Sequence, residues 1–449
     1  MVGLRGVVRG EVVSSSRRAF VLGGGVAGMA AAFGLADRGY RVTLLESRNR
    51  CGGRAFATHD PVLGRGVDNG FHVMLGCYRA MRSLCRRLGT EDGFEQNPRL
   101  QLRYRFATGR SASLSLSGLP VPLAMPWAVA RLGVSPVTRL RAMLGMGSVL
   151  VGAPASWTFA DWLRRRWQRG EPDDVLWRPL CRAVMNCEPE EASARVFLAT
   201  MREAFLGRAG RAALWVPKQT WGELLGAPAP RAFASAGVTL RTRARVLALE
   251  RRGGSVAGLA LADGERVEVG ASDLVVSAMP WFALQRVLGD EAPTPFGQLR
   301  SAPIVTAYFD AGSGAPPPDE GPVVALVGAR PFHFLLRTPG DETRRFALLS
   351  GGDRSFDGMS TDAVAASARQ QVARYYAGVD LERAKVRVRK EQYATFVSSP
   401  DAEALRPAPG RLAGGPDNLV VCGDWTATGF PATLEGAARS SEQLLATLS

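Results

Sequence analysis

Histidine, lysine and paired cysteines are scarce in this chain of 449 residues. It has three His, and lysine occurs only at positions 218, 385 and 390. None of the six Cys stands in a C-x-x-C pair, so the residue types that build zinc sites do not cluster. We therefore expect no metal site, and we expect the reduced, mostly buried thiols of a cytosolic protein.

The sequence also lacks an uninterrupted apolar run of the roughly 20 residues that span a bilayer. Residues 111–130 carry no charge but contain three prolines, and an interior proline costs a helix about 3 kcal/mol. Residues 142–160 are uncharged but are interrupted by Gly and Pro. The region 118–153 therefore has two interpretations, an apolar segment that contacts one membrane leaflet or the buried wall of a lipophilic pocket.

Acidic residues are too few to balance the arginines. Lys and Arg number 56 against 41 Asp and Glu, which gives a net charge of +15. Such an excess suits anionic membranes, nucleic acid or acidic ligands. The arginines are scattered, and no nucleic-acid motif with interleaved aromatic residues is present. We expect peripheral contact with an anionic membrane and no nucleic-acid partner.

The N-terminal region has two incompatible interpretations. Arg17-Arg18 ahead of an apolar run resembles a twin-arginine export signal, which is removed from the mature protein. The same run leads into Gly23-x-Gly25-x-x-Gly28, the pattern of the phosphate turn in a dinucleotide-binding fold. Removal would leave the rest of the chain without this turn. We therefore favour the binding turn, with residence in the cytoplasm or on the cytoplasmic face of a membrane.

A β-α-β unit is expected around these glycines. The pattern predicts a strand, a helix and a second strand at residues 19–22, 26–38 and 41–45. The unpaired N–H groups of the first helical turn, at Val26 and Ala27, would face phosphates. Glu46 follows the second strand, about 20 residues after the glycines, where its carboxylate can accept hydrogen bonds from a ribose diol.

A second glycine pair lies just beyond this acid. The chain runs from Ser47 through Arg-Asn-Arg-Cys to Gly52-Gly53-Arg54. This R-x-G-G-R pattern resembles the FAD-binding signature of the amine oxidase and phytoene desaturase superfamily. Two glycines permit close backbone approach, and the Arg54 guanidinium offers a fork to a diphosphate. The resemblance implies FAD as the cofactor, with Ser47 beside it.

The C-terminal region extends the resemblance. An apolar strand at 418–422 ends at Gly423-Asp424, and a helix is expected to begin near Thr433-Leu434. In the superfamily the matching Gly-Asp holds the ribityl chain, and the first helical N–H groups face the flavin pyrimidine. A helix N-terminus there stabilises negative charge on the flavin. The alternative is that Asp424 serves only as a helix cap.

The resemblance implies an α/β fold with two domains. One is a Rossmann-type FAD-binding domain of the glutathione reductase/amine oxidase kind, with Val246 at the position that touches adenine. The other is an α+β substrate domain. The FAD-binding segments are expected at 19–75, 232–285 and 412–449, and the substrate-domain segments at 76–231 and 286–411.

The segment Asn69-Gly70-Phe71-His72 and the mid-chain run 186–197 narrow the resemblance to one family. They resemble the squalene-associated FAD-dependent desaturases, now known as hydroxysqualene dehydroxylases, and imply cofactor contacts at Asn69, Gly70 and Phe71. The family pattern has Gln where Phe71 stands, whereas plant-type carotene desaturases carry an apolar residue there. An oxidative carotenoid desaturase of the phytoene or zeta-carotene type therefore stays as the alternative.

The family resemblance implies reductive removal of the allylic hydroxyl of hydroxysqualene to give squalene, an isoprenoid precursor of hopanoids. Hydroxide is a poor leaving group, so an acid must protonate it. His72 is the expected acid, because its motif adjoins the flavin unit and imidazole titrates near neutral pH. The alternatives are a purely structural His72, His333 as the acid, or a protonated carboxylate in an apolar pocket.

Aromatic faces would stabilise the developing allylic cation. The candidates are Phe71, Trp127, Trp425 and Phe430. Two further alternatives keep the same fold, a flavin-free protein that binds prenyl lipids and a soluble amine oxidase. The intact glycine pattern argues against the first, and the apolar region 118–153 argues against the second.

Overall fold

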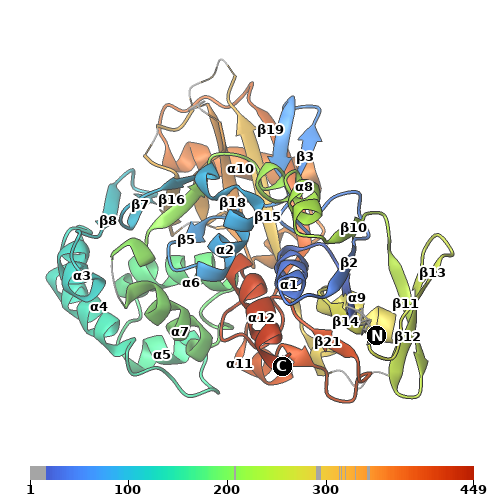
Figure 1. The fold of residues 1–449 in the computed structure, drawn as a ribbon. Helices are drawn as coiled ribbons and strands as arrows, with labels where there is room; N and C mark the ends of the chain where they lie inside the picture. The colour runs from blue at the N-terminus through green and yellow to red at the C-terminus, as the bar shows by residue number, and fades with distance from the viewer. Residues whose placement is uncertain are drawn as a thin grey trace, which may run out of the picture.

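One layer of the molecule is a six-stranded sheet (Figure 1). The computed structural model describes residues 17–448, except 207–208, 290–294, 313, 315, 319, 329 and 341–343. In spatial order the strands are β10 (Thr239–Arg241), β2 (Arg41–Leu45), β1 (Arg18–Leu22), β14 (Leu274–Ser277), β21 (Leu419–Val421) and β20 (Gly410–Arg411). All neighbours are parallel except β20, which runs antiparallel to β21. The sheet thus combines three separated stretches of the chain.

The expected β-α-β unit is present at the centre of this sheet. β1 and β2 pair in parallel from Arg18 and Arg41 to Leu22 and Leu45. The helix between them, α1 (Val26–Ala36), is rich in small residues and packs on β1, β2 and the C-terminal helix α12 (Leu434–Thr447). The helix ends two residues before the expected position.

Arg18 belongs to the folded sheet. Its Nε donates to Asp273 Oδ1 (3.1 Å), and Asp273 lies directly before β14. This ion pair joins the starts of two neighbouring strands, so the residues that resemble an export signal form part of the sheet. Ser16, which precedes the arginine pair, lies outside the described residues.

A seven-stranded sheet forms the second layer of the molecule. In spatial order its strands are β19 (Lys385–Phe396), β15 (Ser301–Asp310), β18 (Arg345–Gly351), β17 (Phe334–Arg337), β16 (Val323–Val327), β7 (Gln101–Phe106) and β8 (Ser111–Ser115). Helix α10 (Thr361–Tyr375) packs against it over a separate apolar core. β8 matches the alternating Ser pattern of the sequence, because alternation places successive side chains on opposite faces.

Three small sheets and the remaining helices complete the fold. The small sheets are β11 (Val246–Arg252), β12 (Ser255–Leu261) and β13 (Arg266–Glu268); β3 (Ala57–Asp60) and β4 (Arg65–Asp68); and β5 (Met74–Leu75), β9 (Leu214–Pro217) and β6 (Phe94–Gln96). The other helices are α2 (Arg79–Leu88), α3 (Val121–Ala130), α4 (Pro136–Ser148), α5 (Phe159–Arg165), α6 (Arg178–Met185), α7 (Ala194–Phe205), α8 (Ala229–Ser235), α9 (Trp281–Leu288) and α11 (Pro400–Leu405). Helices α3 to α7 gather at one end, and β11 to β13 project at the other (Figure 1).

The apolar region 118–153 folds as two short helices, α3 and α4. Pro120 is the N-cap residue of α3 and Pro136 begins α4, positions where a missing N–H costs little. Within the described ranges, no helix has both the length and the apolar character needed to cross a bilayer. Both helices nevertheless present large apolar side chains to the outside, with Leu123 at 61% and Trp127 at 70% exposure.

The mid-chain run 186–197 braces the helical end against the seven-stranded sheet. Asn186 ends α6 in the left-handed region (φ 51°), and its Nδ2 donates to Thr395 Oγ1 (2.8 Å) on β19. Glu188 accepts from both Arg178 (2.7 Å) and Arg182 (2.8 Å) of α6. Asn186 thus connects the end of α6 with β19, and Glu188 holds the run against α6.

His333 is buried beside this brace, and its titration makes the stability of the fold depend on pH. Its Nδ1 accepts from the Gly351 N–H (3.4 Å), and Nε2 has no hydrogen-bond partner among the described residues. Burial, reinforced by the charge of Arg182, lowers the pKa of His333 from 6.5 to about 3. His333 therefore takes up a proton below about pH 6.5 in the unfolded chain, but only near pH 3 in the folded chain.

Replacement of His333 should flatten the acid dependence of stability. Since the folded pKa is depressed, wild type loses up to about 1.4 kcal/mol per pH unit as the pH falls from 6.5 towards 3. His333→Asn keeps an acceptor for Gly351 and removes this titration. We expect a smaller drop in thermal midpoint between pH 7.5 and pH 5 than in wild type or in His59→Asn, which alters an exposed His. Equal drops in all three proteins would contradict the assignment.

Candidate active site

Three of the predicted cofactor residues lie at the carboxyl edge of the six-stranded sheet. Gly23 follows β1, Glu46 follows β2, and Gly423 lies just beyond β21. Because β1, β2 and β21 are parallel, their carboxyl ends lie at one edge, where open α/β sheets bind ligands. The order β2-β1-β14-β21 explains how residues from both ends of the sequence reach one place.

Two glycine turns contact each other directly at this edge. The Gly52 N–H donates to the Gly24 carbonyl (2.9 Å). A Cβ on Gly53 would lie 2.9 Å from Gly25 Cα, and a Cβ on Gly28 would lie 1.8 Å from the Gly23 carbonyl oxygen. Side chains are therefore excluded at this contact, so a bound diphosphate could approach the backbone closely.

The first turn of α1 points into the same cradle. Gly25 is the N-cap residue and supplies no side-chain hydrogen bond. The N–H groups that open the helix, at Val26 and Ala27, thus have no side-chain cap, and unpaired N–H groups favour anions. The cradle fits the phosphates of a dinucleotide cofactor.

Three hydrogen bonds fix the carboxylate of Glu46 at the end of β2. Its buried carboxylate accepts from the N–H groups of Gly24 (2.6 Å) and Arg48 (2.7 Å) and from Ser47 Oγ (3.1 Å). A carboxylate offers about four acceptor sites, so capacity for a ribose hydroxyl remains. The Glu46 carbonyl accepts from Ala244 N–H (2.9 Å), which places Val246 at the start of β11 close to this end.

An ion pair connects the first and last cofactor motifs. Arg54 Nη2 lies 2.5 Å from Asp424 Oδ1, and Arg54 Nη1 donates to the Ala394 carbonyl (2.8 Å) at the end of β19. The alternative that Asp424 only caps this helix is wrong, because Thr433 caps α12 by accepting from the Gly436 N–H (3.0 Å). Leu434 is the first residue of α12, as expected.

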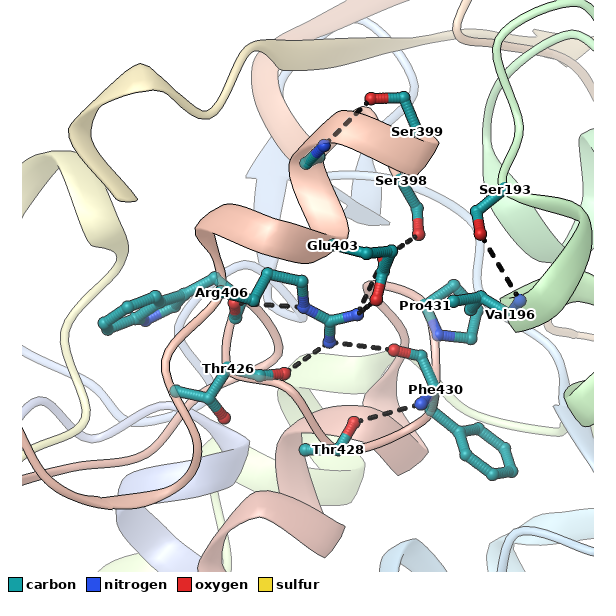
Figure 2. Close-up of polar contacts among 12 residues, drawn as sticks. Ser193, Val196, Ser398, Ser399, Glu403, Arg406, Thr426, Thr428, Phe430 and Pro431 are labelled. Atoms are coloured by element: carbon teal, nitrogen blue, oxygen red, sulfur yellow. Dashed lines mark hydrogen bonds and ion pairs between the residues drawn. The ribbon is translucent and has the colours of Figure 1, made fainter. Parts of the chain in front are cut away.

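Figure 2 shows a residue that sequence analysis missed, the arginine Arg406 that follows α11. Its buried guanidinium donates to Glu403 (2.8 Å) and to carbonyls of the loop after β21. The carbonyl acceptors are Asp424 (3.3 Å), Trp425 (3.2 Å), Thr426 and Phe430 (2.9 Å). One side chain thus fixes the loop that carries Asp424. No motif marks Arg406, because its partners are backbone atoms of another segment.

His72 lies between the flavin cradle and the seven-stranded sheet. A Cβ on Gly70 would lie 3.7 Å from His72 Cε1 and 3.9 Å from Ile304 on β15. The His72 ring packs edge-on against Trp221, with centroids 6.0 Å apart, and the Trp221 indole donates to the His72 carbonyl (3.2 Å). Asn69 Nδ2 donates to Glu391 Oε2 (2.8 Å). This segment therefore lies against β15 and β19 of the seven-stranded sheet.

The two titratable groups of this segment have opposite pKa shifts. Burial, with a contribution from the Arg54 charge, lowers the pKa of His72 to about 4. His72 Nδ1 is buried and has no hydrogen-bond partner among the described residues. Burial raises the pKa of the nearby Asp68 to about 7, although Trp221 N–H donates to its carboxylate (2.8 Å). His72 is thus neutral at pH 7, whereas Asp68 is about half protonated.

The four aromatic candidates are not brought together. Trp127 lies on the outer surface of α3, and Trp425 is fully buried against Phe296 (centroids 4.7 Å apart). Phe71 and Phe430 belong to a different core from Trp425. The four candidates therefore do not share one environment, because adjacency to a glycine motif does not fix the direction of a side chain.

The cradle and the parallel sheet define an oxidoreductase that uses FAD. Residues 26–443 match the family described as flavin containing amine oxidoreductase, and the chain belongs to this family. Membership in a flavin-containing family supports FAD as the cofactor and argues against the flavin-free alternative.

Individual relatives are similar to this chain over nearly its whole length. A hydroxysqualene dehydroxylase of Sinorhizobium fredii is 29% identical over 427 residues, covering 94% of this chain and 96% of that protein. A zeta-carotene desaturase of Synechocystis is 24% identical over 476 residues, covering 95% and 96%. A solved oxidoreductase from Methanosarcina mazei has the same fold, with a TM-score of 0.72 at 13% identity over 95% of this chain and 99% of that one.

Proposed function

We propose that this flavoenzyme reductively removes the allylic hydroxyl of hydroxysqualene to form squalene. The observation that carries the proposal is the 29% identity to a hydroxysqualene dehydroxylase across nearly the full length of both chains. The apolar exterior of α3 and α4 suits a lipophilic isoprenoid substrate. An oxidative carotene desaturase is the alternative. It is supported by the 24% identity to a zeta-carotene desaturase, which is lower than the 29% identity to the dehydroxylase.

We assign FAD to the segments 19–75, 232–285 and 412–449, and the substrate to the segments 76–231 and 286–411. Bound FAD supplies hydride chemistry to the site. The residues assigned to hold it are Gly23, Gly25, Val26, Ala27, Gly28, Glu46, Ser47, Gly52, Gly53, Arg54, Asn69, Gly70, Phe71, Val246, Gly423, Asp424, Thr433 and Leu434. The Arg54–Asp424 pair and the Asn69–Glu391 bond orient these segments towards each other.

We assign proton delivery to His72. The departing hydroxyl takes one proton and leaves as water, while the allylic carbon takes a hydride, so atoms and charge balance. His72 has an unpartnered buried Nδ1, and Trp221 holds its backbone and ring. A pKa of about 4 makes the protonated imidazole a strong acid that is rare at neutral pH. Asp68, with a pKa raised to about 7, is the carboxyl alternative.

A single anaerobic turnover tests the reaction. Reduced flavoprotein mixed with hydroxysqualene should yield squalene in step with flavin reoxidation, and oxidised protein should yield none. Hydroxysqualene left unchanged beside reduced flavin would reject the proposal. The oxidised enzyme would then be assayed with phytoene-like polyenes, since the desaturase alternative removes hydrogen from such substrates.

The pH dependence of that turnover distinguishes the two proton donors. If His72 donates, the single-turnover rate constant should rise up to tenfold per pH unit as the pH falls from 7 towards 5, because the protonated fraction grows. His72→Gln should remove this rise, and His59→Gln should keep it. A rate that is constant below pH 7 and falls above it would assign the proton to Asp68 instead.

We further propose that the α3–α4 face rests on a membrane leaflet. Large apolar side chains are exposed along it at Leu119, Leu123, Trp127, Val137, Leu140, Met143, Leu144, Leu150 and Val151. Apolar patches of this extent mark protein or membrane contacts. Arg139 and Arg141 donate to the backbone carbonyls of Val134 and Trp167, so they hold the helices in place. Arg131 is exposed and has no such partner among the described residues.

A further inference from the structure

A cavity of about 260 Å³ opens beside the α3–α4 face. It lies between the strands β7 and β8 and the helix α3, and the residues that line it are Arg99, Gln101, Ser115, Leu116, Ser117, Leu119, Ala124, Trp127 and Arg131. Two of its lining residues are cationic and none is acidic. Its rim shares Leu119 and Trp127 with the exposed apolar face.

The two arginines of this cavity are available for a ligand. Both side chains are exposed, and neither has a hydrogen bond or an ion pair with any described residue. Most other arginines of the chain are engaged, as Arg18, Arg54 and Arg406 illustrate. Two unpaired guanidinium groups at one cavity repel each other, and a shared anion removes that repulsion.

We propose that this cavity binds the phosphate group of an anionic phospholipid in the leaflet on which the α3–α4 face rests. The inference deepens the proposed membrane contact and depends on it. Arg99 and Arg131 supply charge and forked N–H donors, and Ser115, Ser117 and Gln101 supply neutral donors at the same cavity.

The size of the cavity and its rim favour a headgroup. Pockets for drug-sized ligands measure about 300–1,000 Å³, so 260 Å³ accommodates a phosphate with its glycerol but not the acyl chains. The chains would continue along Leu119, Leu123 and Trp127, which are 50%, 61% and 70% exposed. Tryptophan is enriched at the headgroup level of membranes, as expected for Trp127 beside the cavity mouth.

Flotation of the full-length flavoprotein with vesicles tests the site. One set contains phosphatidylcholine alone, and the other contains phosphatidylglycerol in addition. Because each basic residue near an anionic surface contributes about 1 kcal/mol, wild type should bind the anionic set at least tenfold more tightly. Arg99→Gln/Arg131→Gln should lose this preference and keep its binding to phosphatidylcholine.

Two matched variants make the result specific. Arg252→Gln/Arg286→Gln removes the same charge from exposed residues on β11 and α9, at the opposite end of the molecule, and should keep the preference (Figure 1). Ser115→Leu keeps both cavity arginines and fills part of the cavity that they line, so it should lose the preference. Retention by Ser115→Leu would show diffuse attraction and overturn the site.

The proposed membrane contact fails by a different result. Leu123→Glu places a charge on the apolar face and should weaken binding to both vesicle sets, including phosphatidylcholine alone. If wild type binds neither vesicle set, or if Leu123→Glu binds as tightly as wild type, the membrane contact is rejected together with the headgroup site. If wild type and Leu123→Glu behave as expected but Arg99→Gln/Arg131→Gln still prefers the anionic vesicles, only the headgroup site is rejected. Circular dichroism and flavin content confirm that each variant is folded.

Discussion

Gly25→Ala should give a folded protein that has lost its FAD. The backbone of Gly25 is at φ −74°, which alanine adopts freely, and the nearest atom to an added Cβ is Gly53 Cα at 3.7 Å. The protein itself therefore tolerates the methyl group, whereas a diphosphate lying against this backbone does not. Loss of two charge-assisted hydrogen bonds, at about 1.5–3 kcal/mol each, weakens FAD binding by about 10²-fold or more.

The measurement is the flavin-to-protein absorbance ratio after purification, followed by titration of the apoprotein with FAD. Gly147→Ala is the control, because Gly147 lies on α4 with no atom within 4 Å of an added Cβ. This control should retain flavin as wild type does, and both variants should have the wild-type circular dichroism spectrum. Wild-type FAD affinity in Gly25→Ala would show that the diphosphate does not pass over Gly25.

Arg406→Met should cost both stability and flavin. The change leaves four loop carbonyls without their donor and Glu403 buried without its partner. Breaking such a buried pair costs about 3–5 kcal/mol. The loop that carries Asp424 is then free to move away from Arg54, so FAD affinity should fall along with the thermal midpoint. Thermal unfolding with and without added FAD, together with FAD titration, measures the two effects.

Arg178→Met separates general destabilisation from a loss specific to the flavin. Arg178 also pairs with several carboxylates, at Asp173, Glu188 and Glu190, but it lies on α6 and contacts no cofactor motif. We expect it to lower the thermal midpoint and to leave FAD affinity near wild type. If the two variants lose stability and flavin in the same proportion, Arg406 has no positioning role beyond holding the fold together.

The cofactor cradle could be predicted from sequence because its requirements are local. The spacing of the glycines alone predicts a turn in which Gly28 approaches Gly23. The same pattern predicts an acidic residue directly after the next strand. The parallel sheet then places Glu46 and Gly423 at one edge without further information. The family resemblance added Arg54 and Asp424 as separate cofactor residues. Their mutual ion pair was not predicted, because it joins the two ends of the chain.

The rest of the site depends on side-chain direction and on long-range contacts that no local pattern encodes. Trp425 follows the Gly-Asp motif, yet its indole donates inward to the Met279 carbonyl (3.0 Å). Arg406 recognises backbone carbonyls, so its role leaves no signature in the residue types of its partners. The pKa of His72 likewise depends on the burial of its ring, which the motif around it does not specify.

The order of strands in the six-stranded sheet has a consequence for biosynthesis. β1 and β2 leave the ribosome early, but β14 and then β21 must be made before the edge beside β1 is complete. Until then Arg54 lacks Asp424 and the loop held by Arg406 does not exist. During most of its synthesis the growing chain therefore contains only the N-terminal part of the cofactor site. We expect FAD to bind at the end of synthesis, when the long-range contacts of the sheet form.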